Sequence, residues 1–205
     1  VLAARLKHLP VHYELEAVHV QMEDIPGHTD TDYIKAFCDE RDVILHTEFA
    51  ESGYKNNSQK NPCFPCSWNR RKTIFMKAEE REANRVAFGH HMDDALETLL
   101  MNMTYHGEYS AFPPKLSMFN GKFDIIRPMM MTKARDIERY AGIIGINKAE
   151  GDCTYGDNSK REEFKKIVGE LSGKHKLAKT NLFNAMSNIY EDFLPPKTEK
   201  TKQKD

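Results

Sequence analysis

RVAFGHHMDDALETLLMNMTY, residues Arg85 to Tyr105, is the stretch from which the fold can be predicted. Its opening residues, up to Gly89, are mostly apolar, which is typical of a short buried strand in a parallel sheet. From Asp93 onward, apolar residues recur three and four positions apart, as on the buried face of a helix. These are Leu96, Leu99, Leu100 and Met103. A strand followed at once by a helix indicates an α/β protein.

The same alternation continues on both sides of this stretch. The other predicted strands are 13–20, 43–47 and 123–126, and the predicted helices are 1–9, 29–40, 67–82, 93–105, 132–141, 162–171 and 179–190. We therefore expect a Rossmann-like α/β fold, a parallel sheet with helices on both faces. Ligands of such sheets bind at the carboxyl ends of the strands.

Length and composition predict one domain over residues 1–194 and a disordered tail over 195–205. No apolar run approaches the roughly 18 residues of a membrane-spanning helix, so we expect no membrane partner. Four cysteines in 205 residues are too few for a disulfide scaffold. The chain shows no export leader at Val1, and a cytoplasmic location is predicted.

Charge is unevenly distributed, although the formal net charge is only −1. Residues 160–205 carry eleven Lys or Arg against seven Asp or Glu. A solvated helix face with a disordered tail and a surface for nucleic acid both fit this excess.

Cys63-Phe64-Pro65-Cys66 places two thiols three positions apart, a spacing that can bind one metal ion or one part of an iron–sulfur cluster. No second pair with this spacing exists, and Cys153 is the most obvious third ligand. Three thiolates would leave one iron of a four-iron cluster open. A structural zinc and a redox pair remain alternatives, whereas Cys38 fits a buried apolar position.

Gly89-His90-His91-Met92-Asp93-Asp94 connects a predicted strand to a helix. Helix N-termini favour anions, and paired carboxylates there can hold magnesium or orient a phosphate-bearing reactant. Alternatively, Asp93 caps the helix and the histidines are surface residues. Arg70, Arg71 and Lys72 follow Cys66 by one helical turn, where they can meet polyphosphate or form solvated surface.

Taken in order, these motifs resemble the tRNA 2-thiocytidine synthetases (TtcA-like), a family of PP-loop ATPases, from about Leu15 to Lys166. The resemblance is carried by Cys63-x-x-Cys66-Ser67-x-x-Arg70-Arg71, Gly89-His90-His91-x-Asp93-Asp94, Glu97-Thr98-Leu99, Asn102-Met103, Gly107, Pro113-Pro114-Lys115-Leu116, Ile126-Arg127-Pro128, and Cys153 with Asn158 and Arg161. It implies an adenine nucleotide alpha hydrolase-like fold.

The resemblance also implies ATP-dependent tRNA thiolation, with 2-thiocytidine as the product. ATP, with Mg²⁺, adenylates a carbonyl oxygen of a tRNA base, and sulfur carried on a [4Fe-4S] cluster replaces that oxygen. Zinc is the alternative metal. The implied partners are tRNA, a sulfur donor such as a cysteine desulfurase, and a second copy in a homodimer.

Roles are assigned to individual residues by the same resemblance. The cluster ligands are Cys63, Cys66 and Cys153; the nucleotide-binding residues are Val20, Gly89, His90 and Asp94; and the catalytic residues are Arg70, Asp94 and Cys153. Two departures matter. The family's glycine-rich loop, Ser-Gly-Gly-x-Asp-Ser, is not in this sequence, and we expect it and its strand to precede Val1. Glu150 stands where relatives carry a cysteine three residues before Cys153.

Two further interpretations stay open at this point. One is another PP-loop reaction on tRNA, such as the synthesis of 2-thiouridine or lysidine, although lysidine formation needs no cluster. The other is a non-catalytic relative that binds metal or nucleic acid.

Overall fold

The computed structural model describes residues 1–6, 8–10, 12–25, 30–53, 63–146, 153 and 160–196. The helices are α1 (Leu2–Leu6), α2 (Thr31–Asp39), α3 (Cys63–Glu80), α4 (Met92–His106), α5 (Ala134–Ile143), α6 (Lys160–Lys174) and α7 (Ala178–Ala185). The strands are β1 (Glu16–Met22), β2 (Ile44–Ala50), β3 (Arg85–Ala87), β4 (Lys115–Met118) and β5 (Phe123–Ile126), and 3₁₀ turns lie at Phe119–Gly121 and Glu191–Phe193.

The described strands form two sheets. β1 and β2 pair in parallel, from Glu16 opposite Ile44 to Met22 opposite Ala50. β5 lies between β3 and β4, parallel to β3 and antiparallel to β4. β1 and β3 are the facing edges, and pockets that lie over the gap between them are lined by residues of both strands.

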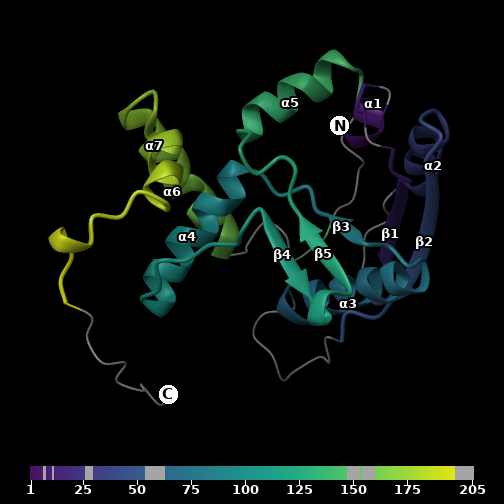
Figure 1. Ribbon diagram of the computed structural model, residues 1–205, viewed down its shortest axis with the longest axis horizontal. Helices are drawn as coiled ribbons and strands as arrows, with labels where there is room; N and C mark the ends of the chain where they lie inside the picture. Colours follow the sequence, from purple (N-terminus) through teal and green to yellow (C-terminus); the bar gives the residue numbers. More distant parts are fainter. Residues whose placement is uncertain are drawn as a thin grey trace.

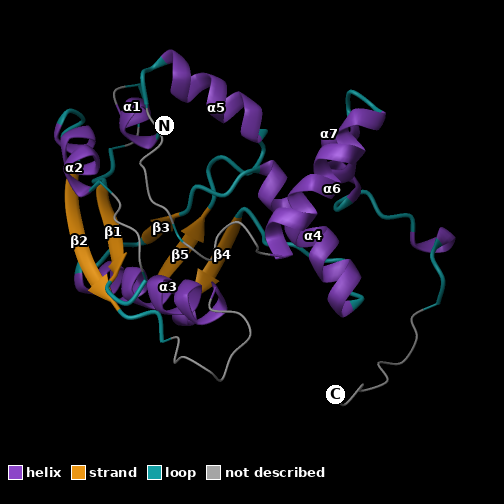
Figure 2. Ribbon diagram, turned by 180° about the vertical axis from the view of Figure 1, so that it is seen from behind, coloured by secondary structure: helices purple, strands orange, loops and turns teal. Residues whose placement is uncertain are grey.

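Helices cover both sides of these sheets, as the sequence predicts. α3 contacts β1, β2 and β3, and so crosses under both sheets (Figure 1). α1, α2 and α5 lie on the opposite side (Figure 1). α4, α6 and α7 pack against one another beside the β4 edge (Figure 2). None of the described helices is long and apolar enough to cross a membrane.

The prediction of an all-parallel sheet is wrong at β4, because Lys115–Met118 pairs antiparallel with β5. A tight reversal joins the two strands: Phe119, Asn120 and Gly121 all have positive φ, at 50°, 57° and 88°. Asn and Gly tolerate this left-handed conformation well, so they allow a hairpin where the sequence predicts only a loop.

Two apolar clusters hold the elements in place. Under the three-stranded sheet, α3 packs Ala78 against Val86, Phe123 and Ile125, and the rings of Phe75, Phe88, Phe119 and Phe123 gather around them. The second cluster joins α4 to α6 through Leu96 and Val168. The predicted inward position of Met103 is wrong, because its side chain is exposed. Cys38 is buried in α2, as predicted.

Several predicted boundaries shift. The first helix ends at Leu6, and the last ends at Ala185 and does not reach Tyr190. Residues 197–205, Glu150 and Asn158 lie outside the described residues, so the disordered tail and the domain limits stay predictions.

Candidate active site

The cysteine pair lies in the first turn of α3, which begins at Cys63. Predicted to sit in a turn ahead of the helix, the pair is instead helical. Pro65 is compatible with this, because the first turn of a helix needs no backbone N–H donor. Residues three apart share a helix face. Cys63 and Cys66 are therefore neighbours on one side of α3, and both are half-buried.

Cys153 lies within electrostatic reach of this pair. Burial raises the pKa of the Cys66 thiol, the nearby Arg70 guanidinium lowers it, and the thiols of Cys153 and Cys63 raise it again. The side chain of Cys153 is exposed, and no disulfide joins any of the four cysteines. The structure thus brings together the three predicted thiols and one predicted cation.

These thiols do not form a ligand set for a single ion: among the described residues, no three His, Cys, Asp or Glu side chains are grouped to hold one metal. The thiols of Cys153 and Cys63 both raise the pKa of Cys66, so both lie near it. In a cluster, each thiolate binds a different iron, so the ligands need not converge on a point. The donor set fits a cluster.

His91 caps the N-terminus of α4, so the alternative of a cap at Asp93 is wrong. The Asp94 amide donates to His91 Nδ1 (3.3 Å), and the His91 amide donates to Asp94 Oδ2 (2.8 Å). This reciprocal pair is a capping box, and the carboxylate of Asp94 also stabilises the positive end of the helix dipole.

Asp93 is buried, and each of its carboxylate oxygens has a partner on another helix. Its Oδ1 pairs with the ammonium of Lys179 on α7, and its Oδ2 accepts from the Ala134 amide at the start of α5 (2.9 Å). Burial alone would raise the pKa of Asp93, but these two hydrogen bonds lower it. Asp93 therefore joins three helices. Of the two carboxylates predicted to bind a metal, Asp93 is buried in helix contacts and only Asp94 is partly exposed.

Asp94 belongs to a charge cluster that also includes Glu97 and Arg161. Arg161, in the first turn of α6, donates from Nη2 to Asp94 Oδ1 (2.9 Å) and from Nε to Glu97 Oε2 (3.0 Å). Glu97 is buried, and burial raises its pKa while Arg161 lowers it. The Arg161 guanidinium thus bridges two acidic side chains of α4.

His90 is enclosed by aromatic rings and cations. Its ring centroid lies 4.9 Å from that of Phe112, and the Arg127 guanidinium lies 4.7 Å from the Phe112 centroid. Burial, then Arg127, Arg161 and Arg71, lower the pKa of His90, against a raising effect of Asp94. The imidazole is therefore neutral at neutral pH.

Two buried nitrogens here, His90 Nδ1 and Arg127 Nε, have no hydrogen-bond partner in the described structure. Burial and the charge of Arg71 also lower the pKa of Arg127. Neither Arg71 nor Arg127 forms an ion pair with a carboxylate of the described residues, so they are uncompensated cations. An anion would stabilise them.

Arg71 and Arg127 form what we call the cation group. Arg70 precedes Arg71 in α3 and acts on the thiol of Cys66, so the two arginines connect the thiols with Arg127. Arg70 acts electrostatically on Cys66 and on His19 of β1, whereas Arg71 acts on His90 and Arg127. Val20, the neighbour of His19, has a buried side chain.

Sequence reasoning gave too little weight to Arg127 and none to His19. The position of Arg127 directly after a buried strand was the available signal.

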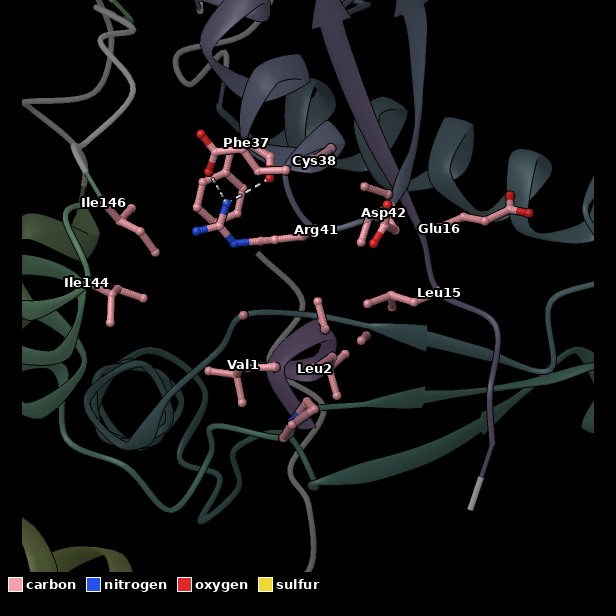
Figure 3. Close-up of a pocket in the computed structure, with 18 of the residues that line it drawn as sticks. Val1, Leu2, Leu15, Glu16, Phe37, Cys38, Arg41, Asp42, Ile144 and Ile146 are labelled. Atoms are coloured by element: carbon pink, nitrogen blue, oxygen red, sulfur yellow. Dashed lines mark hydrogen bonds and ion pairs between the residues drawn. The ribbon is translucent and has the colours of Figure 1, made fainter. Parts of the chain in front are cut away.

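A cavity of about 650 Å³ lies over the gap between β1 and β3. Apolar side chains such as Leu2, Leu15, Phe37 and Ile144 surround it (Figure 3). Of the predicted site residues, only Gly89 lines this cavity. The thiols, Arg71 and Arg127 do not line it, so this apolar cavity is not the place where the predicted chemistry gathers.

Known proteins resemble the chain in both sequence and structure. A tRNA-cytidine(32) 2-sulfurtransferase from Hahella chejuensis is 32% identical over 195 residues, which cover 92% of this chain and 67% of that protein. A second, from Paraburkholderia phymatum, is 32% identical over 206 residues, covering 95% of this chain and 59% of that protein. The chain thus spans about three fifths to two thirds of the length of these relatives.

Among solved structures, the U34-tRNA thiolase NcsA from Methanococcus maripaludis with its [4Fe-4S] cluster matches with a TM-score of 0.71 and 21% identity. The match covers 91% of this chain and 64% of that one, and it confirms the α/β fold. No protein-family model matches the chain. The relatives found by sequence confirm the family that the motifs predict. The chain belongs to the family of tRNA-cytidine(32) 2-sulfurtransferases.

Proposed function

We propose that the protein containing this chain replaces the 2-oxygen of a cytidine in tRNA with sulfur, at the expense of ATP. One observation carries the proposal: Cys63, Cys66 and Arg70 lie within the first turns of α3, and the thiol of Cys153 is near enough to raise the pKa of Cys66. The next residue of α3, Arg71, acts electrostatically on His90, just before α4, and on Arg127, just after β5. The proposed site for sulfur would therefore adjoin the proposed site for phosphate.

Cys63, Cys66 and Cys153 would hold the [4Fe-4S] cluster. When bound, the cluster supplies an iron that no cysteine occupies and that can carry sulfur. The chain itself must keep its ligands ionised. Burial and the neighbouring thiols oppose ionisation of Cys66, and Arg70 favours it. Arg70 is exposed, so it can also face a reacting base and stabilise the charge that develops there.

The uncompensated cations support the proposed ATP site. Arg71 and Arg127 would bind phosphate oxygens, and neutral His90 would donate or accept one hydrogen bond beside them. Asp94 keeps lone pairs for Mg²⁺ although it accepts from His91 and Arg161. Adenylation makes the base oxygen a leaving group, and these cations would offset the charge of the departing pyrophosphate.

The gap between the sheets supports a second part of this proposal. Residues of β1 and of β3 line the pockets on both sides of the gap. We infer that the expected strand of the glycine-rich loop pairs between these edges, which would place the loop above Gly89 and the backbone of Val20 beside the adenine.

Sulfur transfer to unmodified tRNA, with ATP and a sulfide source, tests the function by mass spectrometry of the released nucleosides. Arg70→Ala should lower the rate roughly 100-fold, in the range found when one charge-stabilising group is removed, and Arg70→Lys should restore part of it. Arg85→Ala is the matched control, because Arg85 is also exposed but lies on β3 beside Asp124. Unchanged activity of Arg70→Ala, or 2-thiouridine or lysidine as the product, would contradict the proposal.

A further inference from the structure

Two large aromatic side chains are exposed at the N-terminal end of α3, beside the thiols. Phe64 is 71% exposed and Trp68 is 62% exposed. Residues four apart lie one above the other on a helix, so these rings share a face. Farther along α3, Phe75 packs into the core against β3 and β5. Phe64 and Trp68, in contrast, belong to neither apolar cluster of the described residues.

The same end of the helix is cationic. Arg70, Arg71 and Lys72 are exposed, and no acidic residue occurs in α3 before Glu79. Arg71 donates to the carbonyl and the hydroxyl of Ser67 (3.2 and 2.9 Å), which holds its side chain along the helix. Its charge also acts on His90 and Arg127, so the cationic surface continues toward the start of α4.

Exposed aromatic rings next to uncompensated cations match the requirements of unpaired RNA. Bases of a single-stranded loop stack on aromatic side chains, while the phosphates that accompany them are neutralised by Arg and Lys. A protein partner would instead need an acidic, apolar surface of its own. Because RNA offers a π-face and a negative charge at every nucleotide, it fits this surface more directly.

We propose that Phe64 and Trp68 form a stacking platform for unpaired bases of the RNA substrate. The inference rests on the proposed function, since Phe64 lies between the two cysteines of the thiol site. A base stacked on the platform would have its neighbour in the RNA loop next to Cys63 and Cys66. The platform thus positions the loop and takes no part in bond making.

Trp68 is the only tryptophan of the chain, so its fluorescence reports on the platform directly. The probes are an RNA hairpin with an unpaired seven-base loop, a common tRNA loop size, and a fully paired RNA duplex of equal length. We expect solvent-exposed emission that the hairpin quenches strongly and the duplex quenches little. Buried-type emission, or equal quenching by both RNAs, would overturn the proposal.

Anisotropy of labelled hairpin RNA gives the energetic test. Phe64→Ala should weaken binding roughly 5- to 100-fold, the range for loss of one base-stacking contact, and Trp68→Ala should act similarly while Trp68→Phe retains most of the affinity. Phe193→Ala is the control, because Phe193 is 86% exposed but lies in the 3₁₀ turn near the end of the described chain. Wild-type affinity in Phe64→Ala, or equal loss in Phe193→Ala, would refute the platform.

These measurements need neither ATP nor a loaded cluster, so they separate the two proposals. Loss of stacking with intact sulfur transfer would remove the platform alone. Stacking without sulfur transfer would remove the function alone. If Phe64→Ala instead weakens binding of a sulfur-donor protein and leaves the RNA affinity unchanged, the surface belongs to that donor and the inference is wrong.

Discussion

Asp93 and Asp94 are adjacent, but the structure gives them separate roles. Asp94 caps α4 and pairs with Arg161, at the edge of the cation group. Asp93 points into the contact between helices, where Lys179 neutralises it. A motif of two aspartates predicted a pair of equal carboxylates. The different roles of Asp93 and Asp94 could not be predicted from the sequence, because Lys179, the partner of Asp93, lies on a helix far along the chain.

Removing the cation partner of Asp93 tests its structural role. Lys179→Met leaves a buried carboxylate with one amide donor, and we expect the free energy of unfolding to fall by about 3 kcal/mol. Lys165→Met, which breaks an exposed pair with Glu162, should change it by less than about 0.5 kcal/mol. Urea denaturation measures both. Equal effects would show that Asp93 does not depend on Lys179.

Glu16 of β1 makes stability depend on acid pH. It accepts from Arg81 (2.9 and 3.0 Å) and contacts His46 Nε2 (2.7 Å). These hydrogen bonds, from Arg81 first, lower the pKa of Glu16 from 4.5 to about 2. Its contribution is therefore complete above pH 4.5 and is lost as the pH falls toward about 2.

Glu16→Gln should remove this acid-dependent contribution. The wild type should exceed the variant by about 1 kcal/mol at pH 6, after allowance for solvent screening, and by much less at pH 2. Thermal unfolding at a series of pH values measures the difference. A constant gap between the two curves would exclude Glu16 as the titrating group.

At the scale of elements, Arg161 fixes the start of α6 to α4. The segment with Cys153 leads into α6, so this contact also limits where the third thiol can lie. Spacing alone predicted both helices, because their apolar residues recur with the helical period. It missed β4, since four residues with one turn give too little periodic pattern. It also missed the helical state of Cys63, because Pro65 and the polar residues before Cys63 indicate a loop.

Arg161→Ala should destabilise the protein by about 2 kcal/mol, less than for a fully buried pair because the guanidinium is partly exposed. The cost arises because Glu97 is left buried without its cation partner. Adding Glu97→Gln should return part of this loss, which a double-mutant cycle by urea denaturation would show. Additive effects of the two substitutions would mean that the pair is not coupled.

For the whole molecule, the gap between β1 and β3 predicts that ATP binding depends on residues outside this chain. A longer protein that carries the expected strand and glycine-rich loop should bind ATP at least roughly 10-fold more tightly than residues 1–205, because loop amides would cradle the phosphates. Isothermal titration calorimetry on both proteins measures this. Equal affinities would show that the described cations suffice.

The shared thiol site is the central claim, and iron binding tests it most directly. After anaerobic reconstitution with iron and sulfide, the protein and its Cys38→Ala variant should each contain about four irons and show cluster absorbance. Cys38 is a fair control because it is buried in α2. Cys63→Ala, Cys66→Ala and Cys153→Ala should each lose most of this iron. Full iron content and an unchanged spectrum in Cys153→Ala, or zinc in place of iron in the wild type, would contradict the account.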